Sequence, residues 1–284
     1  MIEVLRAGAL TTVQDLGRPG WAHLGVPRSG ALDQPALRLA NRLVSNPEGA
    51  AALEVTVTGC ALRLAARTTI ALTGAPAALT VAGRPASYGV AVPVPAGGVV
   101  DVGRASSGVR SYLAVAGGIA VPPVLGSRST DTLSGLGPAA LRDGARLPVG
   151  EDAGPPSTVD FTPWSAPPAP LELRIRLGPR DDWFTADAIR VLLRSAYTIG
   201  VASNRVGARL AGPSLRRAVA GELPSEGLVL GAVQVPADGQ PLVFLADHPT
   251  TGGYPVVGVV DDADLPLLAQ VRPGDSVMFR GPQL

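Results

Sequence analysis

Six short apolar segments follow one another between residues 52 and 119, and this succession limits the fold more than any other feature of the chain. Their sequences are LEVTVTG, LRLAA, TTIALTG, ALTVAG, GVVDVG and RSYLAVAGG. Several alternate apolar and polar residues, as a half-buried β-strand does. Turns intervene about every 8 to 12 residues, a spacing typical of a β-sandwich or β-barrel. We therefore predict a mainly β protein with a few helices.

The proline-rich segment at residues 150–171 marks the clearest boundary along the chain. It reads GEDAGPPSTVDFTPWSAPPAPL, and its six prolines disfavour both helices and central strands. Proline-rich chain tends to form a semi-rigid spacer. With 284 residues, the chain slightly exceeds the size at which one hydrophobic core stops growing. We predict an N-terminal β domain at residues 1–165, with a polar arm and one helix, and a C-terminal β-barrel domain at residues 166–284.

Two helices stand out between the predicted strands. The first, at residues 32–47, has Asp33 as its N-cap and Pro35 in its first turn. The second, at residues 181–197, has apolar residues at helical spacing. The strands expected after it lie at residues 227–235, 241–246, 256–260 and 276–279, and a short helical turn lies at 262–270.

The basic residues exclude several functions. All 24 positive side chains are arginine, and the chain contains no lysine. A Schiff-base lysine, a Walker lysine and a biotin-accepting lysine are therefore excluded. The net charge of +1, with arginines scattered along the chain, argues against nucleic acid as a partner. Any bound anion must be held by arginine, by hydroxyls or by backbone N–H groups.

Other side chains limit the location and the chemistry. No apolar run approaches the roughly 18 residues needed to cross a bilayer, and the first residues lack the apolar region of a signal peptide, so we expect a cytoplasmic protein. The single cysteine, Cys60, is expected in the core. No zinc- or iron-type ligand spacing occurs, so no metal site is predicted. The two histidines, His23 and His248, have no accompanying G-x-S-x-G motif, which disfavours a hydrolase triad.

The longest polar segment spans residues 10–33, ahead of the first predicted helix. Long polar loops of this kind carry function more often than ordinary connections do. Alternatively, the segment is a surface arm whose polar groups satisfy one another. Its chemically capable side chains are Gln14, Asp15, Arg18, His23, Arg28, Ser29 and Asp33.

Two shorter segments place arginine beside hydroxyls or glycine. In VLGSRSTDTLSG, residues 124–135, Arg128 lies among serines and threonines, which suits either an anion or a capped turn. In SNRVGARLAGP, residues 203–213, Arg205 and Arg209 form either part of a site or an ordinary solvated pair.

The segment ADHPTTGGYP, residues 246–255, interrupts two buried strands. The consecutive glycines after Thr250 and Thr251 could form a nest of backbone N–H groups that binds an anion. The structural alternative is a hairpin turn that uses glycine for positive φ. Asp247 and His248 end the preceding strand, so one face could offer a carboxylate, an imidazole and two hydroxyls.

These polar segments together resemble a known family. The matching blocks include TTVQDLGRPGWAHLGVPRSGALD, YLAVAGGI, VLGSRSTDT and SEGLVLGAVQVPADGQPLVFLADHPTTGGYPVVGVV, and the resemblance covers nearly the whole chain. The chain is similar to the KipA-type proteins, also described as allophanate hydrolase subunit 2-like or biotin-dependent carboxyltransferase A/B proteins. Their best-defined functional class is the C subunit of 5-oxoprolinase. Asn204 and His248 depart from the family pattern, which has Asp and Arg there.

The resemblance implies tandem cyclophilin-like β-barrel domains and an enzyme subunit that works with partners. In the 5-oxoprolinase class, it works with a KipI-type partner, the B subunit, and with the ring-opening A subunit to convert 5-oxo-L-proline to L-glutamate. ATP, together with Mg²⁺, would act at the level of the complex, and any biotin would arrive on another protein. The open alternatives are a carboxyltransferase subunit of a urea carboxylase or allophanate-type system, and a non-catalytic antagonist of a KipI-type histidine kinase inhibitor.

The resemblance and the residues together nominate the site. The candidate catalytic residues are Asp15, Asp247, Thr250 and Thr251. The candidate substrate- or phosphate-binding residues are Gln14, Arg18, Ser29, Arg205, Gln234, Gly252, Gly253 and Tyr254.

Overall fold

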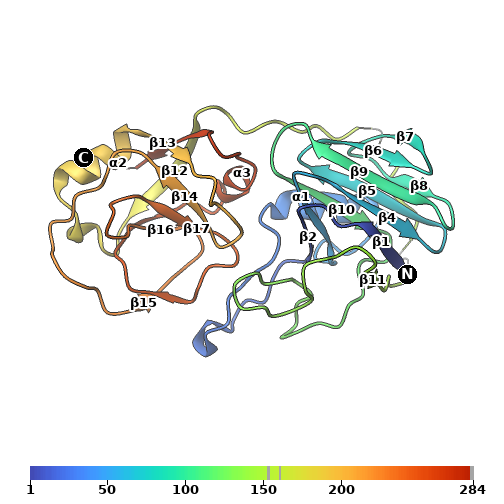
Figure 1. Cartoon of the computed structure of the whole chain (residues 1–284), viewed down its shortest axis with the longest axis horizontal. Coiled ribbons are helices and arrows are strands. Elements are labelled where there is room, and N and C mark those ends of the chain that lie inside the picture. The colour runs from blue at the N-terminus through green and yellow to red at the C-terminus, as the bar shows by residue number, and fades with distance from the viewer. Residues whose placement is uncertain (152–153, 160, 282–284) are drawn as a thin grey trace. The chain divides into compact units, whose positions relative to one another are not determined.

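A computed structural model describes residues 1–151, 154–159 and 161–281 (Figure 1). The chain divides into two compact units. The first comprises Met1–Arg18 and Ser29–Ala166, and the second comprises Pro19–Arg28 and Pro167–Leu284. After residue 166 the chain passes from the first unit into the second, close to the predicted boundary. The short stretch at 19–28 also belongs to the second unit.

The first unit is built on two antiparallel sheets. The six-stranded sheet has the order β11 (Arg146–Leu147), β1 (Ile2–Arg6), β4 (Cys60–Leu64), β9 (Val99–Ala105), β6 (Ala77–Val81) and β7 (Arg84–Ala86). The five-stranded sheet has the order β2 (Leu10–Gln14), β3 (Ala52–Thr56), β10 (Arg110–Val115), β5 (Thr68–Gly74) and β8 (Val92–Val94). Leu62 and Val102 of one sheet share a buried cluster with Leu53 and Leu113 of the other, so the two sheets enclose one core.

The helix of the first unit, α1 (Gln34–Leu43), confirms the first predicted helix. The carboxylate of Asp33 accepts a hydrogen bond from the Ala36 backbone N–H at 3.0 Å, which satisfies a donor that a helix start leaves open. The apolar face of α1, including Leu37 and Ala40, packs with Tyr112 of the five-stranded sheet. The helix thus covers that sheet and fixes the point at which the polar arm ends.

The second unit contains a closed barrel. Its strands run in the order β12 (Leu171–Leu177), β19 (Val256–Val260), β16 (Ala232–Gln234), β17 (Leu242–Phe244), β14 (Gly207–Ala211), β13 (Ala196–Ile199) and β20 (Ser276–Arg280). A separate pair joins β15 (Glu226–Gly227) to β18 (Thr251–Gly252). The remaining helical elements are η1 (Ala22–Leu24), η2 (Asp181–Trp183), α2 (Ala186–Arg194) and α3 (Leu265–Leu268). The prediction of a mainly β protein with a barrel is confirmed: the strands of the first unit form two sheets, and seven strands of the second unit close into the barrel.

Two local predictions were wrong because distant strands decide the structure. Residues 246–255 do not close a hairpin, since β17 and β19 each pair with β16, which lies between them. The second helix is shorter than the predicted 181–197: it begins at Ala186 after the Thr185 cap and ends at Arg194. The next residues form β13, whose Ala196 pairs with Met278 of β20.

The proline-rich segment runs in an irregular conformation alongside the first unit; its residues 152, 153 and 160 lie outside the described residues. The backbone N–H of Ser157 donates to the Leu43 carbonyl at 2.9 Å, and the Thr162 hydroxyl donates to the Gly89 carbonyl at 2.6 Å. The segment therefore has fixed contacts rather than acting as a free tether. Among the described helices, none is both long and apolar enough to cross a membrane.

Candidate functional site

Asp15 joins two polar segments that lie more than a hundred residues apart in the sequence. Its carboxylate accepts hydrogen bonds at 2.6 Å from the hydroxyls of Ser127 and Ser129 and from the Arg128 backbone N–H. The Gly17 backbone N–H donates a fourth, at 2.8 Å. A carboxylate with four donors is held firmly in place, so the geometry suits a residue that positions the two segments.

Gln14, Arg18 and Ser29 gather on the same turn. The amide nitrogen of Gln14 donates to the Thr130 carbonyl at 3.0 Å, and the Ser29 hydroxyl donates to the same carbonyl at 2.9 Å. The Arg18 guanidinium donates to the Ser129 carbonyl. Four of the predicted site residues, Asp15 included, therefore meet in the first unit. Nothing in the sequence indicates that residues 10–33 and 124–135 come together in this way.

Other members of the long arm lie elsewhere. His23 is exposed, stacks against Trp21 with ring centroids 6.3 Å apart, and has its Nδ1 3.1 Å from the Gly20 carbonyl. Arg28 is also exposed. Both side chains therefore lie outside the buried polar cluster around Asp15.

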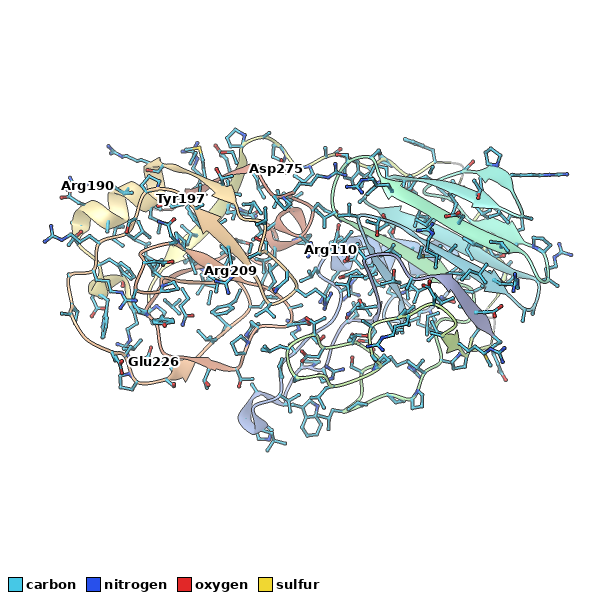
Figure 2. The ribbon with its side chains drawn as sticks, viewed as in Figure 1. Arg110, Arg190, Tyr197, Arg209, Glu226 and Asp275 are labelled. Carbon is cyan, nitrogen blue, oxygen red and sulfur yellow. The ribbon has the colours of Figure 1, made fainter. Side chains whose placement is uncertain are left out.

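A buried group that the sequence reasoning missed holds the end of the arm. Glu54 of β3 accepts hydrogen bonds from the Leu32 backbone N–H at 3.1 Å and from the Tyr112 hydroxyl at 2.7 Å, and Tyr112 in turn accepts from the Asp33 N–H at 2.8 Å. The Nε of Arg110, labelled in Figure 2, lies 3.7 Å from Glu54. Burial, followed by the negative charges of Glu54 and Asp33, raises the pKa of Tyr112 well above its usual value. The only sign of this buried group in the sequence is a glutamate within a mainly apolar predicted strand.

In the second unit, Arg205 and Asp247 form a buried ion pair. The Nε and Nη2 atoms of Arg205 each lie 2.9 Å from one carboxylate oxygen of Asp247, and the two side chains are 1% and 0% exposed. The Asp247 N–H also donates to the Arg205 carbonyl at 3.1 Å. A solvated arginine pair is therefore the wrong description of this segment: Arg205 is buried, whereas Arg209, labelled in Figure 2, is exposed.

In the loop after Asp247, Thr251 and Gly252 are extended, and the predicted nest is wrong. Neither Gly252 nor Gly253 has positive φ, whereas a nest alternates right- and left-handed residues. Thr251 and Gly252 instead form β18, in register with Gly227 and Glu226 of β15. A Cβ at Gly252 would lie 2.7 Å from the Gln234 side-chain nitrogen, so close packing explains this glycine.

Three side chains surround the end of this loop. Gln234 is buried and donates to the Tyr254 carbonyl at 2.9 Å. Tyr254 itself is 47% exposed, with the Arg217 guanidinium 5.8 Å from its ring centroid. Arg217, which the sequence analysis did not select, also donates to the Val235 carbonyl at 2.7 Å. The loop is therefore anchored at one end while Thr251 and Tyr254 face solvent.

His248 has a local role. It is buried, its Nδ1 lies 2.7 Å from the Pro249 carbonyl, and its ring is 6.1 Å from that of Phe244. No cluster of three or more His, Cys, Asp or Glu side chains with metal-binding geometry occurs in the described parts of the chain.

The comparisons with known proteins define the family. Residues 24–281 match the family model described as carboxyltransferase domain, subdomain A and B. The chain therefore belongs to this family of carboxyltransferase domains.

Individual relatives narrow the comparison. The chain is 41% identical to the C subunit of 5-oxoprolinase from Escherichia coli over 98% of its own length and 90% of that protein. It is 34% identical to the C subunit of 5-oxoprolinase from Haemophilus influenzae over 100% of its length and 92% of that protein. The crystal structure of the K. lactis urea amidolyase superposes with a TM-score of 0.87 at 32% identity, covering 98% of this chain but only 18% of the amidolyase.

Proposed function

We propose that this chain is one subunit of an ATP-dependent 5-oxoprolinase that converts 5-oxo-L-proline to L-glutamate. It acts with a KipI-type and a ring-opening subunit, and it is inactive without them. The observation that carries the proposal is the end-to-end match to the C subunit from E. coli, which leaves only a tenth of that protein uncovered. The urea amidolyase match, by contrast, covers a small part of a much longer chain.

The loop hydroxyls and the buried polar residues have different roles in this proposal. Thr251, exposed in β18, and Thr250 beside it offer hydroxyls for the substrate or for an oxyanion formed from the lactam carbonyl. Gln234 and the Arg205–Asp247 pair hold the loop in place through the contacts described above. Asp247 and Asp15 act as positioning residues in this proposal, because their oxygens are already engaged by other side chains or backbone N–H groups.

ATP belongs to the complex rather than to this chain alone. The described residues offer arginine and backbone donors for phosphate, but no cluster of three or more acidic, His or Cys side chains for a metal ion. With no lysine available, arginine is the only side chain that can place a full positive charge against a phosphate at every pH of interest. When bound, ATP would supply a phosphoryl group to the lactam oxygen, while this chain binds and orients the lactam.

Reconstitution tests the proposal. The three subunits are purified separately and mixed with 5-oxo-L-proline, ATP and Mg²⁺, and glutamate release is measured with each subunit omitted in turn. Glutamate release that requires this chain supports the proposal. No release from the complete mixture, with all subunits folded and associated, would reject it.

A carboxyltransferase role in urea carboxylation is the second candidate, favoured by the 0.87 TM-score with the urea amidolyase. It requires carboxybiotin delivered by another protein, since this chain has no lysine to carry biotin. The genes beside the coding sequence discriminate between the two: a biotin carboxylase and a biotin carrier favour this role, whereas genes for the KipI-type and ring-opening subunits favour the first.

A further inference from the structure

The guanidinium of Arg18 is buried without a carboxylate partner. Arg18 is 1% exposed, and its only hydrogen bonds within the described residues go to the carbonyls of Ser129 and Val124, the latter at 3.4 Å. Its Nη1 is fully buried and has no hydrogen-bond partner among the described residues. A buried cation is costly unless its N–H groups are paired, so the unpartnered Nη1 calls for an acceptor.

Three further buried atoms in the same two segments, 13–18 and 129–131, also lack partners among the described residues. They are Oε1 of Gln14, Oγ1 of Thr130 and Oδ2 of Asp131. These side chains are each 4% exposed or less. Buried polar atoms without partners are rare in proteins, and four on two segments that are hydrogen-bonded to each other point to a bound molecule.

The four atoms belong to one small region of the first unit. Gln14 donates to the Thr130 carbonyl at 3.0 Å, the Thr130 N–H donates to the Val13 carbonyl at 2.8 Å, and Arg18 donates to the neighbouring Ser129 carbonyl. These bonds hold the stretch at 13–18 against the turn at 129–131. The unpartnered atoms therefore belong to two chain segments that hydrogen bonds already hold together.

The chemistry of the atoms specifies what they would bind. Arg18 offers N–H donors and a positive charge, so it requires an oxyanion. Gln14 and Asp131 offer acceptors, so they require N–H donors, and the Thr130 hydroxyl serves either role. We propose that this cluster binds a small molecule in which a carboxylate stands next to an amide N–H. The inference rests on the proposed function for its biological ligand, because 5-oxo-L-proline has both groups on one ring.

Binding to the intact chain tests the site without requiring turnover. Titration calorimetry is carried out with 5-oxo-L-proline and N-acetylglycine, which combine a carboxylate with an amide N–H. The comparison probes are 2-pyrrolidinone, which lacks the carboxylate, and inorganic phosphate, which lacks the N–H. We expect the first two to bind at least about tenfold more tightly than the others, since each comparison probe leaves buried groups unpaired. Failure of the wild-type chain to bind either amide carboxylate would overturn the proposal and leave ordered water as the occupant.

Two variants separate binding from folding. Arg18→Gln should weaken binding of N-acetylglycine by about 10- to 100-fold, because it removes a charge-assisted contact. Thr130→Val removes a hydroxyl that has no partner, so the free chain should be as stable as the wild type while the ligand binds about five times more weakly. Arg142→Gln, at an exposed arginine of the same unit, is the control and should bind normally. Wild-type affinity in both Arg18→Gln and Thr130→Val would refute the site.

The site and the proposed function can fail independently. If the reconstituted enzyme releases glutamate and Arg18→Gln leaves its KM for 5-oxo-L-proline unchanged, the function stands and the site is wrong. If the chain binds N-acetylglycine through Arg18 while the complete enzyme forms no glutamate, the site stands and the proposed function is wrong.

Discussion

The buried ion pair of the barrel predicts a large and one-sided loss of stability. In Asp247→Ala, the guanidinium of Arg205 loses both 2.9 Å contacts to the carboxylate and stays in a position that is 1% exposed. Removal of one partner of a buried pair costs about 3–5 kcal/mol, because the remaining buried charge loses its ion-pair partner. An exposed pair costs only about 0–1 kcal/mol. Burial therefore sets the expected loss at about 3 kcal/mol or more.

Urea unfolding of the intact chain, followed by circular dichroism, measures this loss. The matched control is Glu172→Ala, which removes the partner of Arg280 in the same barrel, where the two side chains are 52% and 49% exposed. We expect the control to change the free energy of unfolding by about 1 kcal/mol or less.

A double variant tests the reason for the loss. Arg205→Met combined with Asp247→Leu removes both charges and fills the space with apolar groups, so it should be more stable than Asp247→Ala alone. The reasoning is refuted if Asp247→Ala costs no more than the exposed control, or if the double variant is less stable than the single one.

Three other substitutions or treatments give independent checks. Thr251→Val should lower turnover of the reconstituted enzyme about tenfold or more with an unchanged urea midpoint, and normal turnover would remove Thr251 from the site. Burial raises the pKa of the Cys60 thiol to about 12, so iodoacetamide at pH 8 should label the unfolded chain but not the folded one; rapid labelling of the native chain would contradict this. Burial, together with the negative charges of Glu54 and Asp33, raises the pKa of the Tyr112 hydroxyl. The stability that this protonated hydroxyl contributes is therefore complete below about pH 10 and is lost as the pH rises further. Tyr112→Phe should then show a shallower alkaline loss of stability than the wild type, and identical pH profiles would count against it.

Local signals in the sequence predicted the local structure well. The first helix follows from Asp33 and Pro35, whose effects act within a single turn, and α1 begins just after Asp33. Strand β5 covers the whole predicted segment TTIALTG, a short run of mainly β-branched and apolar residues bounded by turns. By contrast, the segment after Arg194 continues a helical pattern, yet pairing with β20 makes it a strand.

The site depended on contacts that the sequence does not display. Asp15 was selected for its position in a polar arm, but its partners Ser127 and Ser129 lie in another segment, and no spacing rule connects them. The glycines after Thr251 suggested a nest, whereas pairing with β15 holds Gly252 extended. Arg205 and Asp247 were each nominated, but only the fold shows that they form a buried ion pair.

One comparison tests the central claim most directly. The purified chain is supplied, in parallel reactions, with the KipI-type and ring-opening subunits of 5-oxoprolinase or with a biotin carboxylase and its biotinylated carrier. Both reactions contain 5-oxo-L-proline, urea, bicarbonate, ATP and Mg²⁺. We predict ATP-dependent glutamate release with the 5-oxoprolinase partners and no carboxylation of urea with the biotin proteins. Carboxylation of urea, without glutamate release in the first reaction, would contradict the assignment to 5-oxoprolinase.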